Sequence, residues 1–160
     1  MKPLKILNDI VMGFTALVLA FMTILVILQV IYRYILSQPF PESQELAIYA
    51  MVYVVMFGST VAVYKKTHIA VTFVVDRCPP ALAFFVRCFA YVALLVFFYL
   101  LADEGWSLTQ RSMFQRSPST GIPVGYIMGS LPVSAVISML YVAEQFYNEV
   151  KNFFGNKHQE

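Results

Sequence analysis

The stretch "IVMGFTALVLAFMTILVILQVIY", residues 10–32, contains 23 residues without a charged side chain. As an α-helix it is long enough to cross about 30 Å of hydrocarbon, which takes roughly 20 residues. Charge-free runs also cover 46–64 and 117–143, and a fourth run, 81–102, is interrupted by Arg87 close to its start. The pattern predicts an all-α integral membrane protein. We place its four transmembrane helices in one domain, at approximately 10–32, 46–64, 81–102 and 121–143.

The overall composition agrees with a chain whose main solvent is lipid. Of 160 residues, 59% are hydrophobic and 12% are charged, whereas a soluble domain is about a quarter charged. The net charge of +2 is too small and dispersed to indicate nucleic acid as a partner. The first span is too long for a signal-peptide core and has no A-x-A cleavage site, so we expect it to be retained.

The distribution of lysine and arginine predicts the orientation. With the N-terminus inside, eight of the eleven basic residues fall on the cytoplasmic side, and no lysine falls outside. The three external ones are Arg33, Arg111 and Arg116. The positive-inside rule then places both termini in the cytoplasm.

Two segments beside the spans are amphipathic. Residues 66–78 predict a short surface helix between spans two and three on the cytoplasmic leaflet, and 144–154 predict an interfacial extension of span four. Lys65 and Lys66 lie beside the first segment and are candidates for contacts with phospholipid headgroups. A plain positive-inside signal accounts for these two lysines equally well.

The short external hairpin between spans one and two carries three charges. Arg33 ends span one, Glu42 lies in the connection, and Glu45 opens span two. We expect Arg33 and Glu45 to pair and so to fix the angle between the two spans. Ser43 is the expected cap of span two. The alternative is that these are solvated loop charges.

Span four has a stripe of small residues. Gly121, Gly125 and Gly129 form two consecutive G-x-x-x-G steps, and Pro132 is expected to bend the helix in mid-span. Small residues allow a second helix to approach closely. Two interpretations remain open: the glycines pack against other spans of this chain, or they form a docking face for another membrane protein.

The spans contain almost no reactive groups. The first, second and fourth have no Asp, Glu, Lys, Arg or His, although such residues mark ion and proton pathways in membranes. His68 and His158 lie in a connection and in the tail, where they cannot hold haem between helices. Cys78 and Cys88 show no metal-binding spacing. We therefore predict neither an enzyme nor a transporter that works alone, and no cofactor or metal.

Four segments carry a resemblance to a known family: "QVIYRY" at 29–34, "PESQELAIYA" at 41–50, "MFGSTVAVYKKTHIAV" at 56–71 and "STGIPVGYIMGSLP" at 119–132. In this order and spacing they resemble the DctQ-type small membrane subunit of tripartite ATP-independent periplasmic (TRAP) transporters, over nearly the whole chain. The family often has an aromatic and a second acid ahead of the ELA segment, where this chain has Pro41 and Gln44.

The resemblance implies an accessory subunit in the inner membrane of a bacterium. In this family a periplasmic binding protein captures a solute, usually a carboxylate, and a large multi-spanning subunit moves it by a sodium-driven elevator motion. The small subunit would act as a stator, and Arg111 and Arg116 would help to dock the binding protein. Sialic acid and C4-dicarboxylates both remain possible solutes. The alternatives are a small exporter, a redox anchor subunit, and an adaptor of another membrane complex.

Overall fold

The computed structural model describes residues 2–37, 40–65 and 80–156. Its helices are α1 (Lys2–Tyr34), α2 (Pro41–Tyr64), α4 (Pro80–Ser112), α5 (Gly125–Met128) and α6 (Ser130–Asn156). Extended pairing in these ranges is limited to an isolated bridge between Arg116 and Pro123. Four helical segments are long and apolar enough to cross a membrane. The predicted all-α fold with four membrane helices is therefore confirmed.

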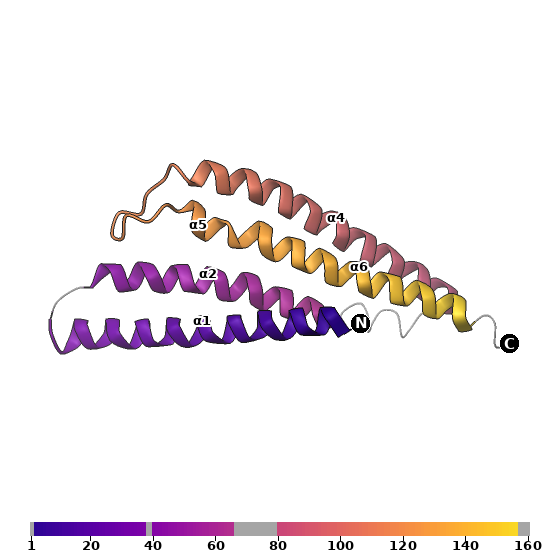
Figure 1. Ribbon diagram of the computed structural model, residues 1–160, viewed down its shortest axis with the longest axis horizontal. Helices are drawn as coiled ribbons and strands as arrows, with labels where there is room; N and C mark the ends of the chain where they lie inside the picture. The colour runs from indigo at the N-terminus through magenta and orange to yellow at the C-terminus, as the bar shows by residue number, and fades with distance from the viewer. Residues whose placement is uncertain (1, 38–39, 66–79, 157–160) are drawn as a thin grey trace.

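The helices form two antiparallel hairpins packed side by side (Figure 1). Helix α1 packs against α2, α4 packs against α6, and contact between α2 and α6 joins the hairpins. The fourth span, Gly125–Lys151, which consists of α5 and most of α6, is the most enclosed: 44% of its most apolar stretch is buried, against 6% for the span in α4. The start of α1 and the end of α6 lie toward one end of the bundle, and the connection 113–124 lies at the other. We name residues 113–124 the outer loop.

Helix α2 begins earlier than expected, and Ser43 is not its cap. Pro41 occupies the first turn, where the absence of an N–H costs nothing, and no side chain caps the helix. Ser43 is instead fully buried, and its hydroxyl donates a hydrogen bond to the Leu25 carbonyl on α1 at 3.1 Å. The side chain therefore joins the two helices of the first hairpin.

Helix α4 continues ten residues beyond the predicted end of its span. Asp103 and Glu104 end the apolar run, yet both are exposed and neither interrupts the helix, which ends at Ser112. At about 1.5 Å per residue the helix is about 50 Å long. The charged pair therefore marks an edge of the apolar surface and does not mark the end of the helix.

The fourth span is also built differently from the prediction. Gly121 has φ +68° in the outer loop, so the helical stripe of glycines cannot begin there. The span begins at Gly125 with α5 and is interrupted at Gly129 before α6. Pro132 has no N–H to offer the Met128 carbonyl one turn back, which explains the interruption. It therefore lies in the first turn of α6 and not in mid-span.

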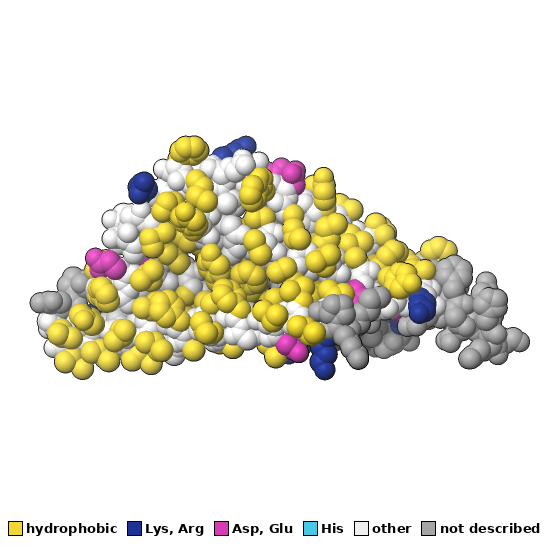
Figure 2. Space-filling view, viewed as in Figure 1, with side chains coloured by type: hydrophobic (Ala, Val, Ile, Leu, Met, Phe, Trp, Pro, Cys, Tyr) yellow, Lys and Arg dark blue, Asp and Glu magenta, His cyan; other side chains and the backbone are white. Residues whose placement is uncertain are grey.

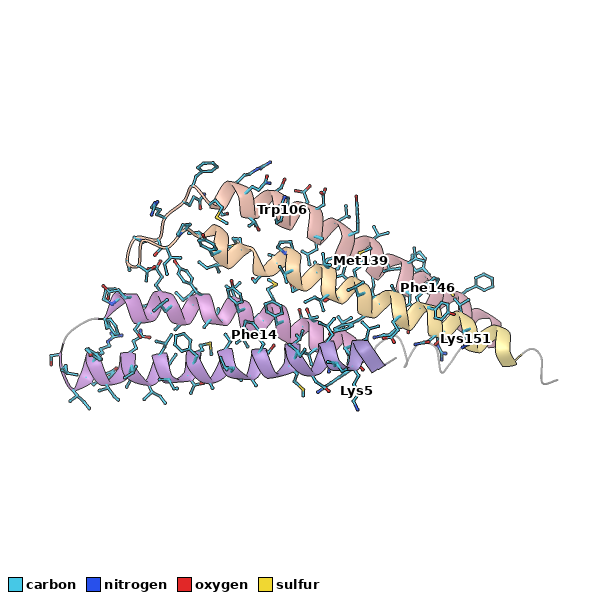
Figure 3. All side chains as sticks on the ribbon, in the orientation of Figure 1. Lys5, Phe14, Trp106, Met139, Phe146 and Lys151 are labelled. Atoms are coloured by element: carbon cyan, nitrogen blue, oxygen red, sulfur yellow. The ribbon has the colours of Figure 1, made fainter. Side chains whose placement is uncertain are left out.

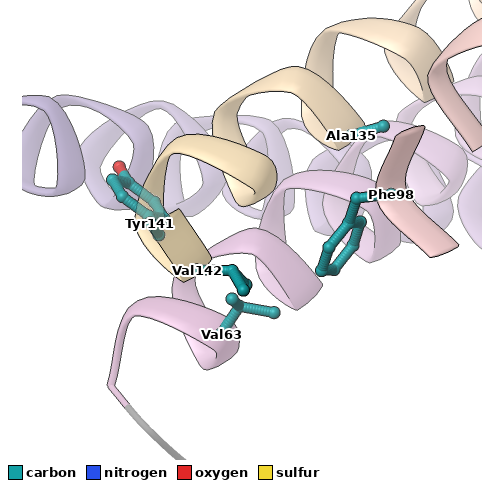
Figure 4. Close-up of a cluster of buried hydrophobic side chains, with 5 residues drawn as sticks. All are labelled: Val63, Phe98, Ala135, Tyr141 and Val142. Atoms are coloured by element: carbon teal, nitrogen blue, oxygen red, sulfur yellow. The ribbon is translucent and has the colours of Figure 1, made fainter. Parts of the chain in front are cut away.

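A cluster of buried hydrophobic side chains lies where α2, α4 and α6 meet. It consists of Val63, Phe98, Ala135, Tyr141 and Val142 (Figure 4), and further buried hydrophobic residues lie along α1, α2 and α5. Most other large apolar side chains are exposed, and they cover much of the visible surface (Figure 2). This surface suits a chain surrounded by lipid tails or by another membrane protein.

Charged side chains gather toward the end of the bundle where the termini lie. Lys5 on α1 and Lys151 on α6 are on that side, whereas Trp106 on α4 lies about midway along the bundle (Figure 3). The predicted surface helix, 66–78, and Lys66 lie outside the described residues. That helix and the headgroup contacts of Lys66 remain predictions.

Candidate functional site

Glu45 binds the outer loop through both oxygens of its carboxylate. The Ser117 and Tyr49 hydroxyls donate to Oε1. The backbone N–H groups of Ser119 and Thr120 donate to Oε2 at 3.2 and 3.1 Å. Consecutive N–H groups in a turn form a concave site for an anion, and here the anion belongs to the protein itself. Glu45 thus fixes a loop more than seventy residues away in the sequence.

A stripe of residues one turn apart on α2 extends this contact. Glu45 binds the outer loop, the Tyr49 hydroxyl donates to Glu45, and the Tyr53 hydroxyl donates to the Tyr126 carbonyl on α5 at 2.8 Å. Tyr53 also stacks on Phe57 of the next turn, with ring centroids 6.1 Å apart. One face of α2 therefore holds both the loop and the start of the fourth span.

Deeper in the bundle, small hydroxyl groups join α2 to α6. The Ser138 hydroxyl donates to the Thr60 hydroxyl at 3.1 Å, and Thr60 lies 3.3 Å from the Ser134 carbonyl. Gln145 donates to the Val63 carbonyl near the end of α2 at 2.9 Å. These residues are buried, so their bonds are shielded from water. They fix the relative position of the two hairpins.

The expected pair between Arg33 and Glu45 does not form, and this prediction was wrong. The Glu45 carboxylate points to the outer loop, which supplies the donors described above. Arg33 is exposed, and its guanidinium carbon lies 6.0 Å from the centroid of the Tyr34 ring. Neutral donors from the second hairpin have taken the place of the nearer cation.

Gly125 has its closest neighbours within the chain. A Cβ atom at this position would lie 2.7 Å from both Cγ and Sδ of Met113, and 2.9 Å from the Met113 backbone nitrogen. At Gly129, a Cβ atom would lie 3.8 Å from Cγ2 of Thr109. These contacts favour the first interpretation of the stripe, in which small residues let the spans of this chain approach each other.

Substituting Gly125 with alanine is therefore expected to destabilise the protein by about 1–3 kcal/mol, the usual cost of overpacking a filled site. Part of the clash is with backbone, which a rotation of the Met113 side chain cannot relieve. Gly58→Ala is the matched control, because a Cβ atom at this α2 position meets nothing within 4 Å. Both variants would be compared by thermal unfolding in the same detergent; equal effects would contradict the close approach.

An ion pair joins α4 to α6 toward the other end of the bundle. Arg87 Nη1 lies 2.8 Å from Glu149 Oε1, with the two side chains 39% and 21% exposed. The rings of Tyr91 and Phe146 lie beside it, with centroids 6.0 Å apart. The sequence predicted only that Arg87 extends toward the headgroups. The signal in the sequence that could have predicted this pair is the carboxylate of Glu149 on the facing helix. Because both side chains are partly exposed to solvent, the ion pair contributes little to stability.

The other predicted residues do not gather at one place. Glu42 is half-buried in the first turn of α2, where its charge favours the helix N-terminus. Lys65 is exposed directly after α2. Arg111 is exposed in the last turn of α4. Arg116 is exposed in the outer loop, where its guanidinium lies 3.5 Å from the Gly121 carbonyl.

These contacts define a class of protein: a multi-span helical membrane protein whose polar side chains tie its helices to one another. The described residues contain no cluster of His, Cys, Asp and Glu that could hold a metal ion. Residues 22–152 match the family model described as "Tripartite ATP-independent periplasmic transporters, DctQ component". The chain belongs to this family, and it is a small permease subunit of a TRAP transporter. This family is a membrane subunit of transporters, which confirms the prediction that the chain is not an enzyme.

Three relatives illustrate the match. The sialic acid TRAP transporter small permease protein SiaQ of Vibrio cholerae is 26% identical over 94% of this chain and 87% of its own length. A putative TRAP transporter small permease protein of Haemophilus influenzae is 24% identical over 81% of this chain and 84% of its own. The sialic acid TRAP transporter permease protein SiaT of Haemophilus influenzae is 31% identical over 72% of this chain, but only 19% of its own length.

Proposed function

We propose that this chain is the stationary accessory subunit of a sodium-driven TRAP uptake transporter for a carboxylate solute. Membership of the DctQ family over residues 22–152 is the observation that carries the proposal. The chain would scaffold a large elevator-type subunit in the inner membrane of a bacterium, with both of its own termini in the cytoplasm. It would also help to dock the periplasmic binding protein.

The internal bonding of the bundle supports the scaffold role. An elevator needs a part that stays in place while the transport domain moves. The Glu45 contact at one end, the Thr60–Ser138 bond in the middle and the Arg87–Glu149 pair toward the other end tie neighbouring helices together at three levels. These bonds resist sliding of one helix past another, and the apolar outer faces of α1 and α4 remain available to a partner or to lipid.

The relation to SiaT supports a large permease as the partner. A segment similar to this chain makes up 19% of that protein, so that the remaining four-fifths lies in the same polypeptide. In this system we propose that the large part is a separate chain. The names of SiaT and SiaQ also favour sialic acid as the solute, with C4-dicarboxylates as the second class.

Charges near the ends of the bundle support the remaining roles. Arg111 and Arg116 are exposed near or in the outer loop and would face a binding protein in the periplasm. Lys65 is exposed at the opposite end of α2, where it and Lys66 would meet anionic headgroups of the cytoplasmic leaflet. Each such lysine contributes about 1 kcal/mol of attraction to an acidic surface.

The test is to express this chain with its chromosomal neighbours and purify the assembly through a tag on this chain in mild detergent. A large polytopic protein is expected to co-purify in about equal amount. Uptake of labelled sialic acid into vesicles should require both membrane chains, the binding protein and a sodium gradient, with a potassium gradient as control. C4-dicarboxylates would be tested in parallel.

Purification of this chain without a large partner, or solute uptake by this chain alone, would contradict the accessory role. Uptake that is equal in sodium and potassium would contradict only the proposed driving ion. Transport of a C4-dicarboxylate in place of sialic acid would reassign only the solute.

A further inference from the structure

The apolar stretches of α4 and of the fourth span are not level with each other. The uncharged part of α5 and α6 covers 125–143, with Ser134 at its middle. The apolar stretch of α4 is 81–102, with Tyr91 near its middle. Tyr91 packs beside Phe146, with ring centroids 6.0 Å apart, and Phe146 lies twelve residues beyond Ser134. At about 1.5 Å per residue, the two middles are therefore about 18 Å apart along the bundle.

This offset places two acids beside the middle of the fourth span. A Cβ atom at Gly105 of α4 would lie 3.0 Å from Cδ2 of Leu131, which is near that middle. Asp103 and Glu104 directly precede Gly105, and both side chains are exposed. Trp106, which directly follows Gly105, lies about midway along the bundle (Figure 3). The charged end of the α4 apolar stretch is thus level with uncharged residues of the neighbouring helix.

The first hairpin is offset in the opposite direction. The middle of the apolar run in α1 is Phe21, and that of the run in α2 is Val55. The hydrogen bond from Ser43 to the Leu25 carbonyl makes these two residues level. Because α1 and α2 are antiparallel, Phe21 is then level with Ala47. The α1 middle therefore lies eight residues, or about 12 Å, closer to the end of the bundle that carries the outer loop.

The two central helices are level with each other, so the offsets of the outer helices add up. Ser138 donates to Thr60 at 3.1 Å, and because α2 and α6 run in the same direction, Val55 is level with Val133. Contacts join α1 to α2, α2 to α6 and α6 to α4, and α1 and α4 lie on opposite sides of the bundle (Figure 1). From α1 to α4 the middle of the apolar surface shifts by about 30 Å, over three interhelical distances of about 8–10 Å each.

A membrane can meet this surface in two orientations. In an upright bundle centred on Ser134, the carboxylates of Asp103 and Glu104 lie in the hydrocarbon. Phe89, which is 77% exposed, then lies about 20 Å from the bilayer centre, beyond the hydrocarbon edge at about 15 Å. In an inclined bundle the acids leave the hydrocarbon and Phe89 enters it. A carboxylate in hydrocarbon is costly, whereas tilting and local thinning of the bilayer cost little, so the inclined orientation is favoured.

We propose that this chain lies obliquely in the bilayer, with its long axis inclined by roughly 45° to the membrane normal. Lipid hydrocarbon covers α1 toward the outer-loop end and α4 toward the end where the termini lie. From Asp103 onward, α4 lies outside the hydrocarbon. This tilt exceeds the usual range of about 0–40°, so the bilayer thins around the shorter apolar stretches. The placement concerns this chain alone and does not depend on the proposed function.

The test measures the depth of tryptophan by fluorescence quenching, using the purified full-length chain in phosphatidylcholine vesicles. The lipid carries bromine atoms either close to the headgroup or close to the bilayer centre. Trp106 is the only tryptophan in the chain, so the native protein already reports the depth of α4. In the oblique orientation Trp106 lies about 15 Å from the bilayer centre. Shallow bromine atoms are therefore expected to quench it more strongly than deep ones.

A second position on the same helix is expected to show the reverse order. Phe89→Trp, made together with Trp106→Phe, places the probe near the middle of the α4 apolar stretch, where deep bromine atoms should quench more strongly. Val133→Trp, also made with Trp106→Phe, is the matched reference. Val133 is exposed on α6 beside Ser134, so it lies near the bilayer centre in both orientations.

Stronger deep quenching of Trp106 than of Phe89→Trp would overturn the proposal, because it would show an upright bundle with the two acids inside the hydrocarbon. The same depth at both positions would also overturn it, since α4 would then lie along the membrane surface. Circular dichroism would check that Phe89→Trp keeps its helix content. If it does not, native Trp106 decides alone: deep quenching overturns the oblique orientation and shallow quenching supports it.

Discussion

Substituting Glu45 with alanine is expected to release the outer loop and expose the Arg116–Ser117 peptide bond to trypsin. In the intact protein, the Ser117 hydroxyl donates a hydrogen bond to the Glu45 carboxylate, and the backbone N–H groups of Ser119 and Thr120 donate to the same carboxylate. Removing the carboxylate leaves these donors to water and frees the loop to open. We expect cleavage after Arg116 to become about tenfold faster or more, since proteolysis follows the population of the open form.

The Glu45 series can separate charge from shape. Glutamine keeps one acceptor oxygen but turns an NH₂ group toward the loop, so that Glu45→Gln should open the loop partially. Glu42→Ala is the matched control, because Glu42 lies one turn earlier on α2 and is not part of the contact with the loop. Fragments ending at Arg116 would be counted by mass spectrometry. Equal cleavage of the Glu45→Ala and Glu42→Ala proteins would show that the loop is held by other contacts.

Helix content was predictable because the signal is local. A run of about twenty apolar residues has few stable alternatives in lipid, since every backbone group must be bonded within the segment. Four such runs therefore predicted the four membrane helices. The ends were less predictable: Asp103 and Glu104 stopped the apolar run without stopping α4, and Pro132 interrupted the fourth span where a bend was expected.

The site was less predictable because its partners are far apart in the sequence. Glu45 had an obvious cation, Arg33, only twelve residues away, but its actual partners lie in the outer loop. Every residue except proline carries a backbone N–H, so a sequence pattern does not show which of these groups bind Glu45. This contact could therefore be found only in the three-dimensional structure. The prediction of a helical glycine stripe that starts at Gly121 was wrong for a related reason. Gly121 takes a left-handed loop conformation, which the G-x-x-x-G spacing alone does not reveal.

Truncation of Tyr141 to alanine is expected to be the most destabilising single change in the bundle, at about 3–5 kcal/mol. Tyr141 is 0% exposed and belongs to the core cluster, where its ring lies 5.0 Å from that of Tyr64. The cavity left by the ring would lie between α2 and α6, the helices that join the two hairpins. Chemical unfolding in detergent would measure the loss, with Tyr147→Ala, at an exposed position of α6, as control.

Tyr141→Phe separates the contribution of the hydroxyl from that of the ring and should not destabilise the protein. Within the described residues the buried Tyr141 hydroxyl has no hydrogen-bond partner, and an unpaired buried polar group is costly. Removing the oxygen keeps the ring packing and relieves that cost, so phenylalanine should leave stability unchanged or raise it. Strong destabilisation by Tyr141→Phe would instead mean that the hydroxyl is bonded in the complete protein. In that case Tyr141 would stabilise the fold through a hydrogen bond as well as through the packing of its ring. The free energy lost in Tyr141→Ala would then be the sum of these two contributions.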